Sequence, residues 1–270
     1  MRCFVAAFLV LPAILAGCGG SSSSSLGNSP TSYPALSGNW SIALIPSNPL
    51  AFEPELGGYI TNTGGAVSGT LHAVDSSCFT AAQDIAISGS VTPEGSITIT
   101  SAAVSGQTIS FTGFTGPSNA PARDPLVLIG SYSITGGCAG GQSGTILGNV
   151  VPPLTGTFSG TFESVSGLSI PVTISVIQSA ANSDGEYTVS GAATFTGSPC
   201  FSAGTITSSV LFGENLQATI TTDKSGVLQF TSIGILLSST SSSGITILGE
   251  YKVTAGSCAG DTGSGTLANQ

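Results

Sequence analysis

Apolar and polar residues alternate along most of the chain from about residue 36 onward. In the segment 245–254, apolar residues or glycine occupy every second position, and threonine, glutamate and lysine stand among the positions between them. The segment 187–195 alternates in the same way. A period of two residues is typical of a β-strand that buries one face. Turn-forming triplets interrupt these runs at 183–185 and 224–226, so the pattern predicts an all-β chain.

The chain also contains an internal repeat. The stretch AVSGTLHAVDSSCF (66–79) returns as TVSGAATFTGSPCF (188–201), and GSYSITGGCAGGQSGT (130–145) returns as GEYKVTAGSCAGDTGSGT (249–266). A repeat of about 120 residues is the length of a duplicated domain rather than of a solenoid unit.

The domain boundary is expected near Pro152-Pro153, because consecutive prolines interrupt strand pairing. We therefore predict two tandem β-domains of about 115 residues, at 36–150 and 151–270.

The second copy divides most easily into strands. Eight runs joined by short turns favour an antiparallel meander closed into a small barrel, and a two-sheet β-sandwich in each copy is the alternative. The expected strands are 156–163, 169–178, 186–196, 203–212, 215–222, 226–237, 244–254 and 262–268.

Each copy contains two cysteines, which are Cys78 and Cys138 in the first and Cys200 and Cys258 in the second. Four cysteines allow three pairings. An ancestral single copy could form a bridge only within itself, so the duplication favours Cys78–Cys138 and Cys200–Cys258. A zinc site is the alternative, but no pair has ligand spacing and the chain contains one histidine.

The amino terminus has the pattern of an export signal. Arg2 precedes an apolar run that is too short to cross a membrane and ends at Leu15-Ala16-Gly17-Cys18. These four residues resemble the lipobox of bacterial lipoprotein precursors. The resemblance implies cleavage between Gly17 and Cys18, a diacylglycerol on the Cys18 thiol and a further acyl chain such as palmitate on the new amino terminus.

The signal peptide is therefore expected at 1–17, and a lipidated, Gly/Ser-rich tether at 18–35. The expected location is the cell envelope. Gly19 after the cysteine favours the outer membrane, by the same resemblance, if the host has one.

Charge narrows the choice of partners. Without Arg2, the 4 basic residues become 3, against 13 acidic ones, which gives a net charge of −10. Nucleic acid is not an expected partner because phosphate binding needs clustered lysine and arginine. The lipid on Cys18 is the expected link to the membrane.

The sequence offers little for catalysis or metal binding. His72 is the only histidine, and because it alternates with Leu71 and Ala73, we interpret it as a surface residue rather than a catalytic base. Two carboxylate pairs, Glu53/Glu55 and Asp184/Glu186, have no counterpart in the other copy. Asn182 together with the second pair is a weak calcium candidate. We predict no enzyme activity, no metal and no cofactor.

Trp40 and Phe158 occupy corresponding positions in the two copies, and so do Tyr132 and Tyr251. A shared position favours a core role for all four over sugar stacking. Gly38-Asn39-Trp40 also resembles the Gly-x-Trp opening of lipocalins, although copy two has Gly156-Thr157-Phe158. That resemblance implies a barrel that carries a small apolar ligand, for which Gly191 and Ala193 would leave room.

The chain as a whole resembles a group of uncharacterised, β-rich, tandem-repeat envelope lipoproteins. The shared segments in copy two are Ser198-Pro199-Cys200 and Gly249 to Gly263, with Asp261 near the end. Copy one has Ser77 before its cysteine and is aligned with Gly141 at the aspartate. No activity is implied.

The leading prediction is a non-enzymatic, membrane-anchored envelope lipoprotein that acts as a binding or surface structural module. Its partner would be a surface polymer or a small apolar ligand. The alternative prediction is a lipocalin-like carrier of a small apolar ligand. A hydrolase on an all-β scaffold is the third reading, and one sixteen-stranded membrane barrel is disfavoured because aromatic girdles are lacking.

Overall fold

The structure is a computed structural model that describes residues 32–51, 54–74, 76–79, 83–117, 126–237 and 244–269. The predicted signal peptide, Cys18 and Glu53 lie outside these residues. All regular secondary structure in the described part is β-strand, and that part contains no helix of the length and apolar character needed to span a membrane.

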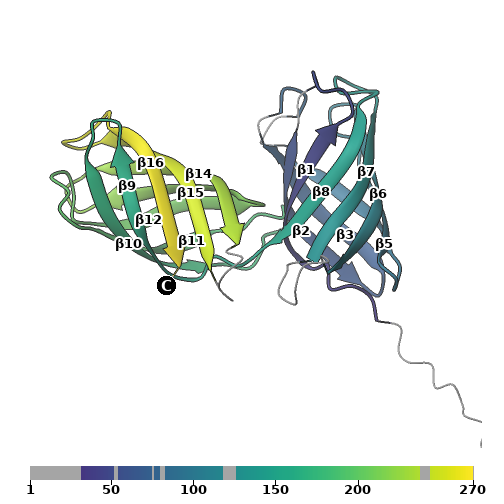
Figure 1. Ribbon diagram of the computed structural model, residues 1–270, viewed down its shortest axis with the longest axis horizontal. Helices are drawn as coiled ribbons and strands as arrows, with labels where there is room; N and C mark the ends of the chain where they lie inside the picture. Colours follow the sequence, from purple (N-terminus) through teal and green to yellow (C-terminus); the bar gives the residue numbers. More distant parts are fainter. Residues whose placement is uncertain are drawn as a thin grey trace, which may run out of the picture. The chain divides into compact units, whose positions relative to one another are not determined.

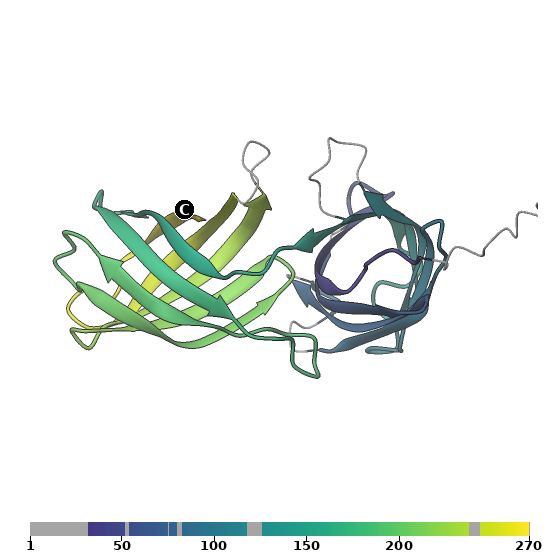
Figure 2. The same ribbon diagram turned by 90° about the horizontal axis from the view of Figure 1, so that it is seen from below.

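The first copy is a closed barrel of eight antiparallel strands joined in sequence order (Figures 1 and 2). The barrel closes where β1 pairs with β8, with Trp40 opposite Val150. Closure leaves no strand edge unpaired. The strands are β1 (Gly38–Pro46), β2 (Glu55–Thr63), β3 (Ala66–Val74), β4 (Ile85–Val91), β5 (Ser96–Ser101), β6 (Thr108–Pro117), β7 (Leu126–Thr135) and β8 (Ser143–Val151).

The second copy repeats this topology and closes where β16 pairs with β9. Seven of its strands lie within one residue of the expected runs. The run 186–196 is shorter as a strand because Tyr187 forms an isolated bridge with Leu211 instead. The strands are β9 (Gly156–Ser164), β10 (Ser169–Gln178), β11 (Val189–Phe195), β12 (Ala203–Phe212), β13 (Asn215–Thr222), β14 (Val227–Leu237), β15 (Ile245–Ala255) and β16 (Thr262–Asn269).

The inward rows of each barrel form a separate apolar core. The expected core residues Trp40, Phe158, Tyr132 and Tyr251 are all buried. In the second barrel the ring of Phe162 stacks on that of Tyr251, with centroids 5.0 Å apart. The alternating pattern therefore identified the inward face correctly, and the barrel, not the sandwich, is the fold.

A disulfide lies at one end of each barrel. Cys78 pairs with Cys138 and Cys200 with Cys258, which matches the pairing expected from the duplication. Phe79, the residue after the first of these cysteines, is buried in the core of its barrel, and Phe201 is its counterpart in the second barrel. Each disulfide thus fastens a loop whose aromatic residue fills the end of the barrel.

Candidate functional site

A cleft of about 440 Å³ opens beside the disulfide of the first barrel. Its walls come from three segments, which are the β1–β2 loop, the loop that carries Cys78 and the turn between β7 and β8. The lining residues are Ser47, Asn48, Ala51, Pro54, Ser76, Ser77, Cys78, Phe79, Cys138, Ala139, Gly140, Gly141, Gln142 and Ser143.

Short hydrogen bonds within the chain fix the shape of these walls. The Ser76 hydroxyl accepts the backbone N–H groups of Cys78 and Phe79, at 3.2 and 3.0 Å. Serine at this position favours such turns because its oxygen replaces a backbone acceptor. Ser198 accepts the N–H of Cys200 in the same way, so both copies build their cysteine loop with the same device.

Gln107 joins two walls of the cleft and is fully buried. Its side-chain amide donates to the carbonyl of Cys78 at 3.0 Å, and its carbonyl accepts the N–H of Ala139 at 2.7 Å. The sequence analysis did not single out this residue. The sequence feature that could have drawn attention to Gln107 is its position directly before a strand, where the other copy has no glutamine.

Among the described residues that line the cleft, polar and apolar groups are mixed and none carries a charged side chain. Its lining combines serine hydroxyls, the amides of Asn48 and Gln142, and the exposed backbone of Gly140 and Gly141. Such a surface can donate hydrogen bonds to hydroxyl or amide groups and accept hydrogen bonds from them.

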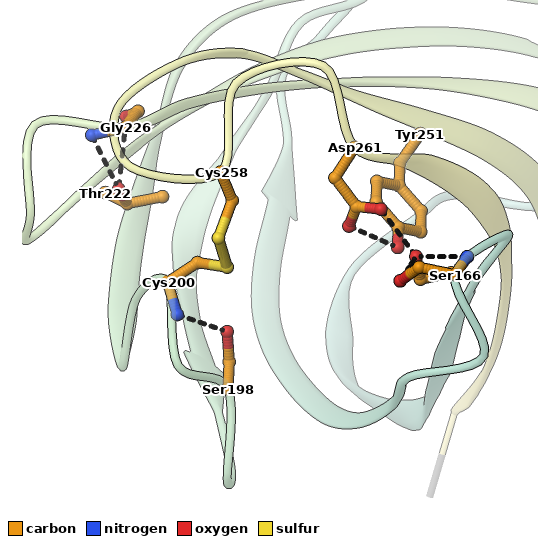
Figure 3. Close-up of a disulfide and its surroundings, with 9 residues drawn as sticks. Ser166, Ser198, Cys200, Thr222, Gly226, Tyr251, Cys258 and Asp261 are labelled. Atoms are coloured by element: carbon orange, nitrogen blue, oxygen red, sulfur yellow. Dashed lines mark hydrogen bonds between the residues drawn. A yellow bond between two sulfur atoms is a disulfide. The ribbon is translucent and has the colours of Figure 1, made fainter.

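At the corresponding end of the second barrel, hydrogen bonds join the turn that follows Cys258 to β9 and β15 (Figure 3). Asp261 accepts hydrogen bonds from the hydroxyls of Ser164 and Tyr251, and the Ser164 hydroxyl also contacts that of Ser166. Burial, followed by the negative charge of Asp261, raises the pKa of Tyr251 to about 12. The phenol therefore stays protonated and continues to donate to the carboxylate.

The counterpart of Asp261 in copy one is Gln142 rather than Gly141. The N–H of Ile134 donates to the carbonyl of Gln142, just as the N–H of Val253 donates to that of Asp261. Aligning the copies on their cysteines missed this, because Cys138 follows Tyr132 by six residues whereas Cys258 follows Tyr251 by seven.

The interior of the second barrel is nearly filled. The free space between its inward side chains amounts to about 30 Å³, whereas sites for small-molecule ligands usually measure about 300–1,000 Å³. The small residues Gly191 and Ala193 leave no larger space, because aromatic side chains such as Phe162 and Phe230 occupy the centre.

His72 is buried, which corrects its interpretation as a surface residue. It points away from the core of the first barrel, as the alternation predicts, but residues of the second copy cover it, so that it is 2% exposed. Its Nε2–H donates to the carbonyl of Asp184 at 2.7 Å, and its ring lies 5.0 Å from that of Phe212. These contacts give His72 a structural role where the two copies meet.

The acidic candidates that the structure describes make separate local contacts. Glu55 accepts the hydroxyl of Ser41 at 2.6 Å. Glu186 lies 3.9 Å from His72, and its carboxylate accepts the amide of Asn182. Among the residues that the structure describes, no three histidine, cysteine, aspartate or glutamate side chains are grouped so as to hold a metal ion.

Glu214, between β12 and β13, was not anticipated from the sequence. Burial raises its pKa, and the nearby charge of Glu55 raises it further, while the N–H of Ile235 at 3.4 Å partly offsets the shift. The ionised carboxylate of Glu214 is therefore energetically disfavoured, next to the contact between the copies.

Comparison with known proteins adds no function. No protein-family model matches the chain, and no curated protein sequence matches it. Kievitone hydratase from Nectria haematococca is a similar solved structure, at 10% identity, with 90% of this chain and 91% of that chain covered and a TM-score of 0.23. A putative AttH from Nitrosomonas europaea is similar at 11% identity, with 85% and 91% covered and a TM-score of 0.21.

Proposed function

We propose that the protein is a non-enzymatic lipoprotein of the bacterial cell envelope, anchored through Cys18, whose first barrel binds a neutral, hydroxyl-rich polymer in the cleft beside Cys78–Cys138. The anchor is supported by Leu15-Ala16-Gly17-Cys18 at the end of the apolar leader. Two or more acyl chains hold a protein on a membrane, whereas one chain binds only marginally.

The observation that carries the binding role is the size and lining of the cleft, and the filled interior of the second barrel argues against a carrier. The open cleft of the first barrel measures about 440 Å³ and is lined by hydroxyl and amide groups, while the apolar interior of the second barrel offers about 30 Å³. A neutral polysaccharide suits the cleft because its hydroxyl groups both donate and accept hydrogen bonds and bring no charge.

The binding test uses the cleft and its counterpart. Ser77→Trp fills the cleft, and Pro199→Trp places the same ring at the equivalent exposed position of the second barrel. In affinity electrophoresis through gels that contain neutral polysaccharides, we expect retardation of the wild type and of Pro199→Trp, and none of Ser77→Trp. Equal migration of all three in every gel contradicts the binding role.

Mass spectrometry tests the lipid anchor and the alternative that the protein carries a small apolar ligand. The intact mass of the protein from its host envelope should equal the chain from Cys18 plus its acyl groups. A native mass spectrum that shows a further few hundred daltons, lost on denaturation, would favour a carrier of a small apolar ligand instead.

A further inference from the structure

An apolar row crosses the outer face of the first barrel. The strand registers pair Phe114 with Ile129, Ile129 with Leu147, and Leu147 with Ala43. Residues directly opposite on neighbouring antiparallel strands have Cβ atoms about 4.5–5.5 Å apart, so the four side chains are contiguous. The row runs over β6, β7, β8 and β1, which lie side by side (Figure 1).

The large side chains of this row are exposed. The exposed fractions are 53% for Phe114, 56% for Ile129 and 44% for Leu147. The Phe114 ring lies over two glycines, since a Cβ atom added at Gly95 or Gly116 would come within 2.8 or 2.7 Å of its atoms. A contiguous row of one exposed aromatic and two exposed aliphatic side chains is a candidate interaction surface.

The chain enters the first barrel at one end of the row. Ser32, Tyr33 and Pro34 line a shallow groove together with Phe114. Residues 18–31 precede this point, so the segment from Cys18 comprises 14 residues, and a chain of that length reaches at most about 50 Å. A lipid on Cys18 therefore holds the Phe114 end of the row near the membrane.

Size favours a bilayer over a second copy as the occupant. The exposed parts of the three large side chains amount to roughly 300 Å², judged from the area that aromatic residues bury, whereas a stable interface needs about 800 Å² on each partner. A net charge of −10 opposes self-association and equally opposes an anionic lipid surface, so charge does not decide between the two occupants. Apolar side chains can enter the lipid boundary individually.

We infer that Phe114, Ile129 and Leu147 insert into the surface of the membrane that holds the Cys18 anchor and so orient the first barrel on it. This inference rests on the lipid anchor of the proposed function. It makes the anchor and the row a two-part attachment, in which the lipid supplies affinity and the row fixes which side of the barrel faces the bilayer.

The experiment uses the mature lipidated protein in phosphatidylcholine vesicles with brominated acyl chains, which quench tryptophan fluorescence on contact. Leu147→Trp reports on the row. Ser88→Trp is the matched control, at an exposed position on β4, which lies across the barrel from β8. The wild type supplies the signal of the buried Trp40. We expect about twofold quenching of Leu147→Trp beyond the wild type, and none of Ser88→Trp.

Equal quenching of the two variants, or none of Leu147→Trp, overturns the inference, and Ile129→Trp repeats the test at the neighbouring row position. Cross-linked dimers in detergent that Leu147→Ser abolishes would assign the row to a second copy instead. The mass of the same preparation separates the two proposals. If acyl chains are lacking, the anchor fails, while quenching of Leu147→Trp on added vesicles still decides the role of the row.

Discussion

Asn39 of β1 and Gly213, between β12 and β13, exchange two hydrogen bonds across the two barrels. The Asn39 side-chain amide donates to the carbonyl of Gly213 at 2.9 Å, and the N–H of Gly213 donates to the Asn39 side-chain carbonyl at 2.7 Å. Gly57 lies at the same contact, where an added Cβ would come within 2.6 Å of the carbonyl oxygen of Phe212. The Asn39 side chain of the first copy thus contacts the Gly213 backbone of the second, and the close approach at Gly57 excludes any larger residue there.

Replacing Asn39 should loosen this contact. Asn39→Ala leaves the buried N–H and carbonyl of Gly213 without partners, which we expect to cost about 2–4 kcal/mol. Differential scanning calorimetry should then show the barrels melting in two separate transitions. Ser88→Ala, at an exposed outer position, is the control. A single, unshifted transition in Asn39→Ala would show that the pair contributes nothing.

Gln107 should stabilise the first barrel and the cleft together. Gln107→Ala removes both bonds that join the Cys78 and Ala139 segments, and we expect a loss of about 2–3 kcal/mol in urea unfolding, with weaker retention by polysaccharide gels. The control is Gln217→Ala, which removes an exposed glutamine from β13 of the second barrel and does not touch the cleft. Unchanged retention in a folded Gln107→Ala protein would remove this residue from the binding site.

The two disulfides should contribute alike to stability and differently to binding. Each closes a loop of about 60 residues, with separations of 60 and 58, which corresponds to roughly 4 kcal/mol on the chain-entropy estimate. Serine at both Cys78 and Cys138 should lower the melting temperature and abolish polysaccharide retention. Serine at both Cys200 and Cys258 should lower the melting temperature while retention persists, and loss of retention there would argue against a cleft-specific site.

Glu214 predicts a pH dependence of stability. Because its pKa is raised in the folded protein, the folded state holds the proton more tightly than the unfolded state. The free energy of unfolding should therefore fall as the pH rises from the unfolded pKa of 4.5 to the folded one. Glu214→Gln keeps an acceptor for the N–H of Ile235 and should flatten this fall and raise the melting temperature at pH 7. A steeper fall in the variant would contradict the burial of charge.

Much of the fold follows from local pattern. Trp40 and Phe158 were placed in the core because they share one alternating position, and a strand that covers a core has one buried face. The choice between barrel and sandwich could not be made locally. It depends on whether β1 reaches β8, and that pairing joins residues far apart in the sequence.

The candidate site was less predictable because it depends on differences between the copies and on contacts between them. The cleft exists where residues 47–54 join β1 to β2, whereas only 165–168 join β9 to β10. Comparing these loop lengths could have revealed it. The burial of His72 could not be foreseen, since alternation tells which side of its own strand a residue occupies and nothing about what the second copy places there.

Closure by the first and last strands also sets an order of events during the proposed export. A chain that crosses a membrane from its amino end delivers β1 before β8, which begins at Ser143. Until β8 arrives, the edge of β1 that will pair with it has backbone groups open to water or to other chains. Cys138 emerges just before β8, so oxidation with Cys78 brings the closing strand back to the growing sheet. The disulfide would then hold an incomplete barrel together before β8 has paired with β1, the stage at which an open sheet is most prone to aggregate.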